Sequence, residues 1–369
     1  MLTLRGDRMP AEVRRILEVL HDASYEAYLV GGYPRDRYMG LVSDDYDICT
    51  NATPEALKKL FPHLEEIRFG SCRLKEGKIE VEITTYREEY EYQDHRFIKN
   101  YRYVDTLEQD VKRRDFVMNT LCMDVDGNYI DLLDAREDID KRMIRTVGDP
   151  FQRLEEDALR ILRAVRFATT LHFNIDPSLQ EAIIEKRDLL KELSKDRIKM
   201  ELERILKDPS GLDWICKLKL EEVLELSDLS NVTWVDDVEF CWAQLNWTHY
   251  PMSRKKIRKI RVIQKLLQQD LYDPIILYQT EDERIRKLAA IKNIPYENIK
   301  QKKELLPIHK TEEIVLSIDD LKRVYASYSD KFIYQCWKDL ELQIVLGKVE
   351  NNEDSIRRFI DQKTSIHQK

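Results

Sequence analysis

The sequence predicts an α+β protein in which a small mixed β-sheet in the first part of the chain is followed by helices. Short apolar runs at 27–30, 46–50 and 79–85 alternate with segments in which apolar residues recur at helical spacing. From residue 207 to the end, the apolar pattern is helical throughout. The 369 residues include only 10 glycines and 11 prolines, and 35% are charged, which is typical of a helix-rich protein.

Composition limits the class of protein. No apolar stretch approaches the length of a membrane-spanning helix, and residues 1–8 lack the apolar segment of a signal peptide, so we expect a cytoplasmic protein without a membrane partner. The six cysteines are scattered singly with no Cys-x-x-Cys pair, which favours reduced thiols over zinc ligands or disulfides. A formal net charge of −8 excludes only a uniformly basic surface, because a nucleic-acid site needs a local basic patch.

Each element of the first part has a local signature. Val13, Ile16 and Leu20 recur at helical spacing, and Thr53 before Pro54 is typical of a helix start. The expected elements, in chain order, are a helix over 8–24, a strand over 27–30, a strand over 46–50, a helix from Pro54, strands over 67–74 and 79–85 joined by a tight loop, and a hairpin over 121–132.

The first strand ends in a turn that suits a phosphate. Gly31 and Gly32 leave room for a ligand against the backbone, and Pro34 suits the first position of the helix that follows. Backbone N–H groups at that helix start, with Arg35 just inside it, attract an anion. The turn is therefore a candidate phosphate site.

Carboxylates follow about ten residues later. Asp45 and Asp47 flank Tyr46, and the period of two in a strand places both on one face. Two such carboxylates, together with substrate phosphates, suit Mg²⁺. Glu82 on the 79–85 strand is a candidate third carboxylate, although a strand glutamate that faces solvent fits the sequence equally well. A phosphate site beside metal carboxylates suggests nucleotidyl transfer.

The segment 88–110 is polar and aromatic and shows neither helical nor strand period. A segment of this length without regular structure is usually functional or mobile. We therefore expect a loop here.

The pattern Gly-Gly-x-x-Arg-Asp, then Gly40, then Asp45-x-Asp47, resembles the first motif of the class II tRNA nucleotidyltransferases and bacterial poly(A) polymerases, a branch of the polymerase-beta superfamily. The resemblance implies a polymerase-beta-like head with an all-α neck, body and tail. It also gives the 88–110 segment the place of the family's flexible loop, although the family's loop motif is only partly present. The implied domains are a head over 1–145, a neck over 146–206, a body over 207–300 and a tail over 301–369.

A second motif lies at 111–121, and it resembles the family's Arg-Arg-Asp-Phe-Thr-Ile-Asn-Ala, which clamps ribose and triphosphate. The residue chemistry supports that use on its own. The guanidinium groups of Arg113 and Arg114 can fork onto phosphate oxygens, and Asp115 can accept hydrogen bonds from ribose hydroxyls. Asn119 completes the motif as a further candidate nucleotide-binding residue.

The segment 153–168 predicts one continuous helix with Asp157 and Arg160 on a shared face. A simple salt bridge within the helix would explain this pair, but in the family Glu-Asp-x-x-Arg selects the base. A carboxylate pairs with the exocyclic amine of cytosine or adenine, and a guanidinium pairs with the unprotonated ring nitrogen beside it, whereas uracil and guanine present the opposite pattern. Arg163 and Arg166 follow in register as nucleotide-binding candidates.

Residues 193–206 resemble the family's fifth motif, with Asp196 in place of the usual glutamate. We expect this segment to brace the base-reading helix. Basic residues cluster between Arg254 and Lys265. They fit either a solvated helix face or a contact with the tRNA backbone.

The resemblance implies an enzyme that uses Mg²⁺ to add C, C and A from CTP and ATP to the 3′ end of tRNA without a nucleic-acid template. Its partners are then tRNA and the two nucleotides, and not DNA. A CC-adding enzyme or a bacterial poly(A) polymerase would share the same head. A noncatalytic RNA-binding protein is the alternative of a different class.

Overall fold

The computed structural model describes residues 9–93, 97–226 and 228–367. Contacts divide the chain into two compact units: Met1–Leu229 with Thr248–Pro251, and Ser230–Trp247 with Met252–Lys369. The four predicted domains remain a prediction. None of the described helices is long and apolar enough to cross a membrane.

The first unit is built on a seven-stranded mixed sheet, ordered β3-β4-β5-β2-β1-β8-β9. The central strands β2 and β5 are parallel, and every other neighbouring pair is antiparallel. The strands are β1 (Ala27–Val30), β2 (Tyr46–Thr50), β3 (Glu65–Arg68), β4 (Ser71–Glu76), β5 (Ile79–Thr85), β8 (Cys122–Met123) and β9 (Tyr129–Ile130). The predicted hairpin of 67–74 with 79–85 is confirmed by the antiparallel pairing of β4 with β5, but its first strand is not continuous, because Phe69 and Gly70 adopt positive φ and turn the chain between β3 and β4.

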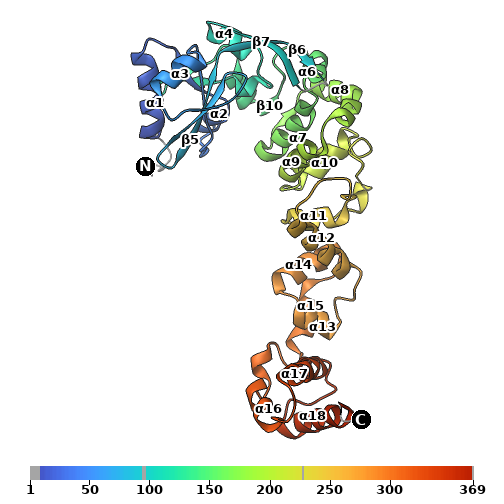
Figure 1. Ribbon diagram of the computed structural model, residues 1–369. Helices are drawn as coiled ribbons and strands as arrows, with labels where there is room; N and C mark the ends of the chain where they lie inside the picture. Colours follow the sequence, from blue (N-terminus) through green and yellow to red (C-terminus); the bar gives the residue numbers. More distant parts are fainter. Residues whose placement is uncertain (1–8, 94–96, 227, 368–369) are drawn as a thin grey trace, which may run out of the picture. The chain divides into compact units, whose positions relative to one another are not determined.

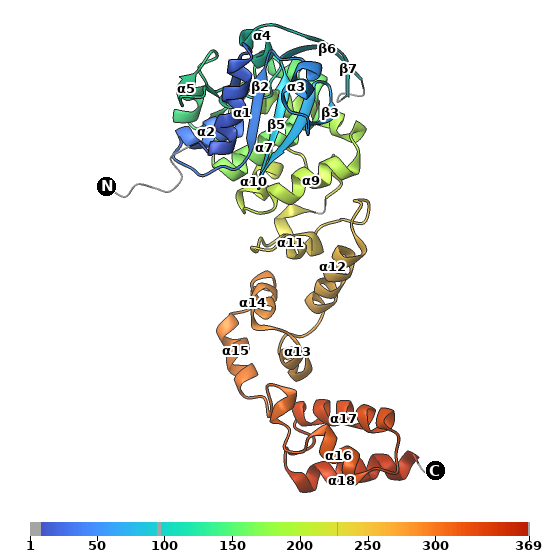
Figure 2. The same ribbon diagram turned by 60° about the vertical axis from the view of Figure 1, so that its left-hand side comes forward.

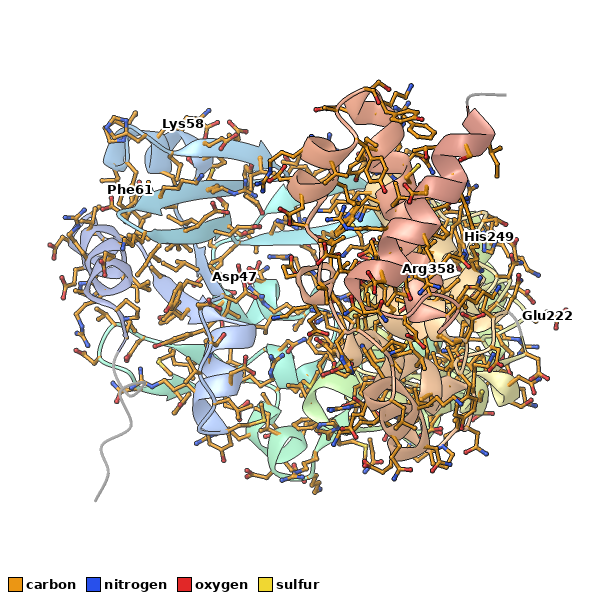
Figure 3. The ribbon with its side chains drawn as sticks, turned by 90° about the horizontal axis from the view of Figure 1, so that it is seen from below. Asp47, Lys58, Phe61, Glu222, His249 and Arg358 are labelled. Atoms are coloured by element: carbon orange, nitrogen blue, oxygen red, sulfur yellow. The ribbon has the colours of Figure 1, made fainter. Side chains whose placement is uncertain are left out.

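Helices α1 (Ala11–Asp22) and α3 (Pro54–Leu60) pack together against this sheet, as Figure 2 shows. Their buried side chains, such as Ile16 and Leu57, join Ile48 and Ile83 from the strands in one apolar core. The predicted cap is confirmed, since the side chain of Thr53 accepts a hydrogen bond from the backbone of Ala56. Asp47 lies near the start of β2, and the chain enters α3 after the end of that strand. Figure 3 accordingly shows Asp47 at a distance from Lys58 of α3 and from Phe61, which follows α3.

The segment 88–110 is not the irregular loop that the sequence suggests. It contains the antiparallel ribbon of β6 (Arg87–Gln93) and β7 (Phe97–Tyr103), followed by α4 (Leu107–Val111). Register shifts near Glu89 and Glu91 interrupt the regular pairing of β6 with β7. A ribbon with such shifts, outside the main sheet, does not need one apolar face, and this is why the strand period is missing from the sequence.

The rest of the first unit is mainly helical (Figure 1). Its remaining helices are α2 (Gly32–Tyr38), α5 (Ala135–Asp140), α6 (Pro150–Glu156), α7 (Leu159–Leu171), α8 (Pro177–Lys186), α9 (Lys195–Ile205) and α10 (Ser210–Lys217). One feature departs from an all-α neck: β11 (Asn174–Ile175) pairs in parallel with β10 (Met143–Ile144).

The second unit is helical among its described residues. Its helices are α11 (Val238–Gln244), α12 (Arg254–Leu267), α13 (Pro274–Gln279), α14 (Asp282–Ile291), α15 (Tyr296–Glu304), α16 (Ile318–Val324), α17 (Asp330–Val345) and α18 (Glu353–His367). On α12, Ile260 and Ile263 are buried, while Arg258, Arg261 and Lys265 are exposed. Contact of this basic face with tRNA remains a prediction.

Candidate active site

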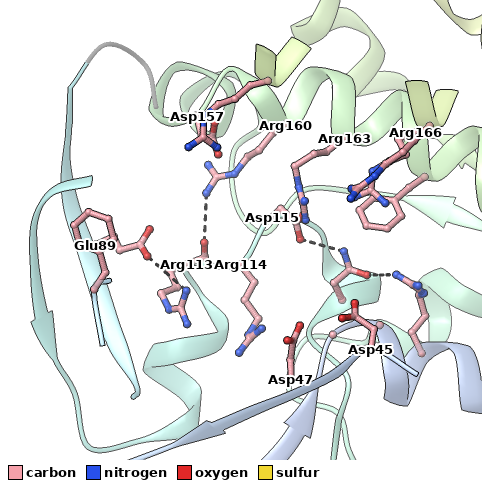
Figure 4. A pocket seen from close by; sticks show the side chains of 18 of the residues that line it. Asp45, Asp47, Glu89, Arg113, Arg114, Asp115, Asp157, Arg160, Arg163 and Arg166 are labelled. Carbon is pink, nitrogen blue, oxygen red and sulfur yellow. Dashed lines mark hydrogen bonds and ion pairs between the residues drawn. The ribbon is translucent and has the colours of Figure 1, made fainter. Parts of the chain in front are cut away.

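A cavity of about 670 Å³ in the first unit gathers the predicted site residues (Figure 4). Ten arginines and six carboxylates line it, so the positive side chains outnumber the negative ones by four and the cavity attracts an anionic ligand. The predicted residues in its wall are Gly31, Gly32, Arg35, Asp45, Asp47, Arg113, Arg114, Asp115, Asn119, Asp157, Arg160, Arg163 and Arg166. Only Glu82 of the predicted set is absent from this wall.

The glycine turn between β1 and α2 lies against the two aspartates. Gly31 has φ +83°, in the left-handed region that favours glycine. A Cβ on Gly32 would lie 3.4 Å from Oδ2 of Asp45, and one on Gly31 would lie 3.8 Å from Oδ2 of Asp47. Pro34 is the third residue of α2 rather than the first, as predicted, but it still lies in the first turn, where backbone N–H groups have no partner within the helix.

Asp45 and Asp47 form the acidic end of the cavity. The pKa of Asp47 is raised to about 7, mainly by burial and also by the neighbouring carboxylates of Asp45 and Glu82, while the guanidinium groups of Arg114 and Arg163 act in the opposite direction. A carboxyl group in such a position holds a proton unless another positive charge approaches. The positive charge of Arg114 and Arg163 therefore does not offset burial and the neighbouring carboxylates, which is the state expected of a cation site.

Glu82 lies next to Asp47, since β5 pairs with β2 in a register that places Glu82 opposite Asp47. Its side chain is exposed. Among the described residues, no group of three or more His, Cys, Asp or Glu side chains could hold a metal ion. The structure thus brings Glu82 beside Asp47 without joining it to a three-carboxylate group, and its catalytic role remains a prediction.

A chain of hydrogen bonds crosses the cavity from the glycine turn to α7. The buried Arg35 donates from Nη1 to Oδ1 of Asn119 at 2.6 Å, and Nδ2 of Asn119 donates to Oδ1 of Asp115 at 3.1 Å. Nε of Arg163 then donates to Oδ2 of Asp115 at 2.9 Å. Burial acts to raise the pKa of Asp115, but Arg163 and the other donors outweigh it and hold that pKa well below its usual range. Asp115 is therefore ionised and fixed in place.

Asp110 holds the two arginines of the second motif, although the sequence analysis did not single it out. Its buried carboxylate accepts from Nε of Arg113 at 2.8 Å and from Nη2 of Arg114 at 2.9 Å. Burial acts to raise the pKa of Asp110, but the two guanidinium groups outweigh it and lower that pKa. The spacing of three and four residues along one helical turn was the signal that could have identified this clamp.

The predicted continuous helix over 153–168 is broken at Asp157. Helix α6 ends at Glu156, Asp157 adopts φ −141° and ψ 96°, and α7 begins at Leu159. The carboxylate of Asp157 accepts a hydrogen bond from the backbone N–H of Leu159 at 3.0 Å, so the side chain competes with the helix and starts a new one. Asp157 and Arg160 therefore do not share a helical face, yet both line the cavity and lie close together in Figure 4.

Arg160 is buried and held by acceptors from two segments. Nη1 donates to the backbone carbonyl of Arg153 at 2.7 Å and to the carboxylate of Glu156 at 3.3 Å, and Nη2 donates to the carbonyl of Arg113 at 3.3 Å. Since a guanidinium has five N–H donors, these three bonds leave two for a ligand. We call Arg113, Asp115, Asp157, Arg160 and Arg163 the arginine end of the cavity.

Three family models match successive parts of the chain. The Poly A polymerase head domain matches residues 27–145, the probable RNA and SrmB-binding site of polymerase A matches 172–225, and the putative domain 2 of tRNA nucleotidyltransferases matches 243–360. The first match contains the acidic end of the cavity and the second motif.

Similar proteins cover almost the whole chain. A CCA-adding enzyme of Leuconostoc mesenteroides is 30% identical over 384 residues, which span 94% of this chain and 95% of that protein. One from Bacillus cytotoxicus is 31% identical over 388 residues, which span 94% of this chain and 97% of the relative. The chain belongs to the CCA-adding enzyme family.

Solved structures of this family have the same fold. The Bacillus stearothermophilus CCA-adding enzyme in complex with CTP is 25% identical, with a TM-score of 0.73 over 98% of this chain and 100% of its own. The Thermotoga maritima CCA-adding enzyme is 19% identical and supports the fold alone, with a TM-score of 0.70 over 96% of this chain and 97% of its own.

The brace on α7 of this family member comes from a residue that the sequence analysis missed. The buried Glu201 on α9 accepts from Nε of Arg166 at 2.7 Å, and the Arg166 guanidinium lies 4.0 Å from the centre of the Phe167 ring. Asp196, in the segment predicted to brace this helix, is instead exposed and lies 3.6 Å from Lys199 of its own helix. Asp196 lies in the first turn of α9 and is exposed to solvent. Glu201 lies further along the same helix and contacts Arg166 of α7.

Proposed function

We propose that this chain adds C, C and A from CTP and ATP to the 3′ end of tRNA without a nucleic-acid template. The observation that carries the proposal is that one cavity is lined both by the carboxylates of Asp45 and Asp47 and by Asp157 and Arg160. The first pair suits phosphoryl chemistry and the second suits selection of a base. Membership of the CCA-adding enzyme family supports joining the two.

Asp157 and Arg160 are proposed to select cytosine and adenine. The carboxylate accepts from the exocyclic amine, and one of the two remaining N–H donors of Arg160 reaches the unprotonated ring nitrogen. Uracil and guanine place a carbonyl and an N–H at the same edge, so each would leave mismatched groups. A mismatched buried donor or acceptor costs about 1–3 kcal/mol, which is enough to reject them. The bonds that fix Arg160 to the carbonyls of Arg153 and Arg113 support this role, because they limit where its free donors point.

The nucleotide's triphosphate is proposed to lie between the glycine turn and Arg35. Gly31 and Gly32 have no side chain to exclude it from the acidic end, and Arg35 brings positive charge to the same wall. Arg113 and Arg114, held by Asp110, present further positive charge. Asn119 and Asp115 are proposed to meet the ribose, with Arg163 keeping Asp115 ionised as an acceptor.

The residues of the acidic end fit Mg²⁺. Two carboxylates with substrate phosphates are a usual ligand set for this ion, and the raised pKa of Asp47 shows that Arg114 and Arg163 do not fully offset burial and the neighbouring carboxylates. Asp45 and Asp47 would hold the metal. When bound, it supplies a Lewis acid that activates the attacking hydroxyl and neutralises the leaving phosphates.

In the proposed reaction, the oxygen of the tRNA 3′ hydroxyl forms a bond to the α-phosphorus of CTP or ATP. The bond from that phosphorus to the bridging oxygen breaks, pyrophosphate leaves, and the hydroxyl proton is released to solvent. The protein residues bind and orient both substrates for this displacement. A cytoplasmic location remains a prediction.

The test is incubation of the purified protein with Mg²⁺ and tRNA that lacks its 3′ CCA, with CTP alone, ATP alone or both, followed by sequencing of the 3′ ends. We expect CC with CTP alone and CCA with both. CC with both nucleotides would indicate a CC-adding enzyme, and long A tails would indicate a poly(A) polymerase. No addition, with tRNA still bound, would contradict the proposal and favour a binding protein.

A further inference from the structure

One face of α9 carries positive charge that the protein itself does not neutralise. Of the ten arginines in the cavity wall, Arg68 and Arg197 make no side-chain hydrogen bond or ion pair with any described residue. The side chain of Arg204 has one such contact among the described residues, at 3.7 Å to Glu201 of its own helix. Both Arg197 and Arg204 are exposed. The other arginines of α7 and the second motif, by contrast, are engaged with acceptors inside the protein.

An apolar side chain lies between these two arginines. Arg197, Met200 and Arg204 are spaced i, i+3 and i+7, so they follow one stripe of α9 (labelled in Figure 2). Met200 is 54% exposed, whereas Ile198 and Leu202 on the other side of the helix are buried. The stripe thus places two exposed guanidinium groups on either side of an exposed thioether.

The acid on the same stripe does not cancel this charge. Glu201 is buried, and Oε2 of its carboxylate accepts from Arg166 at 2.7 Å, deeper in the same wall. Oε2 of Glu201 is therefore engaged with Arg166, and Oε1 makes only the 3.7 Å contact with Arg204, so both outer guanidinium groups keep N–H donors for a ligand from solvent. We call Arg197, Met200 and Arg204 the α9 stripe.

We infer that the α9 stripe binds the unpaired 3′ strand of tRNA just before its accepting hydroxyl. This inference rests on the proposed function, which requires two anionic substrates in one cavity. The residues assigned to the nucleotide are at the glycine turn, in the second motif and at the start of α7, so the α9 wall remains for the second substrate. Its two guanidinium groups match successive phosphates of an RNA strand, to which arginine binds with paired donors.

The exposed Met200 favours an unpaired strand over a duplex. The face of a base is open to contact only where the strand is unpaired, while an RNA duplex presents phosphates and 2′ hydroxyls. Proteins that bind single strands combine a positive track for the backbone with a side chain on which a base packs. The α9 stripe has both parts within two turns of one helix.

The test compares the full-length Arg197→Gln/Arg204→Gln variant with wild type on tRNA that ends in CC, with ATP as the nucleotide. We expect KM for tRNA to rise about tenfold and KM for ATP to stay within about twofold. The slope of log K for tRNA against log salt should become less steep by about 1.4, since each lost single-strand phosphate contact contributes about 0.7. A matched control is Lys78→Gln/Lys207→Gln, which removes the same charge at exposed positions outside the cavity wall.

Two further measurements test whether the α9 stripe contacts the unpaired 3′ strand or another part of the substrates. On tRNA trimmed to a blunt acceptor stem, the affinity difference between wild type and the arginine variant should vanish. Met200→Glu, at an exposed position, should weaken binding of the CC-ended tRNA and leave the melting temperature unchanged. The inference is overturned if the arginine variant behaves like the lysine control, or if only its KM for ATP rises. In either case, extension of tRNA by wild type still upholds the proposed function. Absence of extension by wild type refutes the proposed function, and the inference with it.

Discussion

The acidic end and the arginine end of the cavity use the same residue types to opposite effect. At the acidic end, burial and two neighbouring carboxylates raise the pKa of Asp47 to about 7. At the arginine end, Asp115 is equally enclosed, but Arg163 and Asn119 hold its pKa well below the ordinary value. The partner, rather than the degree of burial, decides the charge of each aspartate.

This difference indicates a division of work. The arginine end keeps its geometry without a ligand, because acceptors within the protein hold its guanidinium groups. The acidic end carries a carboxyl group with a raised pKa, which fits the cation proposed to bind there. We therefore expect changes at the acidic end to abolish the reaction, and changes at the arginine end to alter which nucleotide is chosen and how stable the protein is.

The largest effect is expected for Asp47→Asn. Loss of one of the two carboxylates at the proposed metal site should remove several kcal/mol of charge stabilisation in the transition state, so nucleotide addition should fall at least about 1,000-fold. The measurement is single-turnover extension of tRNA lacking CCA. The control is binding of the same tRNA, which should remain within about twofold because Asp47 lies outside the α9 stripe.

The same variant tests the raised pKa of Asp47. A carboxyl group whose pKa is higher in the folded state than in the unfolded state destabilises the fold as pH rises from about 4 to about 7. Without divalent cations, Asp47→Asn should therefore melt at a higher temperature than wild type above pH 7, and the gap should close near pH 4. Melting curves in chelator check this. A gap that is constant with pH would contradict the assignment of the shift to this group.

Asp157→Asn is expected to alter selection of the base. An amide can donate to the carbonyl of uracil as well as accept, so the preference for C over U should fall by about 10-fold to 100-fold, which corresponds to about 1–3 kcal/mol. Competition between CTP and UTP on one tRNA gives this ratio directly. Arg37→Gln, which lies outside the cavity wall, serves as a control and should keep the wild-type ratio.

A smaller effect on stability is expected at the pair of Asp115 and Arg163. Arg163→Met leaves the buried carboxylate without its main partner and should lower the free energy of unfolding by about 1–3 kcal/mol at pH 7. The double variant with Asp115→Asn should recover part of this loss, because no unpaired charge remains. Denaturant unfolding of the four proteins of the cycle measures the coupling. Additive effects would show that the pair contributes nothing beyond its separate members.

The smallest effect is expected for Glu201→Gln. The amide oxygen can still accept from Arg166, so the brace on α7 weakens but persists, and the addition rate should fall about threefold. Asp196→Asn is the matched control on the same helix and should not change the rate, because Asp196 is exposed and faces away from α7. The nucleotide-addition rates of the two variants, measured under identical conditions, show which of the two acids braces α7.

Much of the fold followed from local patterns. The apolar stripe of α1, the cap at Thr53 and the alternation along β5 are each encoded within about ten residues, and the structure contains all three. The ribbon β6–β7 was missed because register shifts near Glu89 and Glu91 interrupt its period. The break at Asp157 was missed because the apolar spacing continues through it, and only the competing hydrogen bond to Leu159 interrupts the helix.

Site residues could be predicted from the sequence where they form a motif, but not where they act by holding another side chain in place. Thirteen predicted residues line the cavity, since the glycine turn and the arginine motif carry their chemistry in sequence. Asp110 and Glu201 act by holding arginines, and Glu201 reaches Arg166 across 35 positions of sequence. Such a contact depends on how two helices pack, and no single segment encodes it.

The division of work between the two ends is tested most directly by sequencing tRNA 3′ ends after incubation with Mg²⁺ and all four nucleoside triphosphates together. The starting tRNA lacks CCA, and wild type is compared with Asp47→Asn and Asp157→Asn. We expect CCA ends from wild type, unextended ends from Asp47→Asn, and extended ends that include U from Asp157→Asn. Faithful CCA ends from Asp157→Asn, or extension by Asp47→Asn at the wild-type rate, would contradict the account.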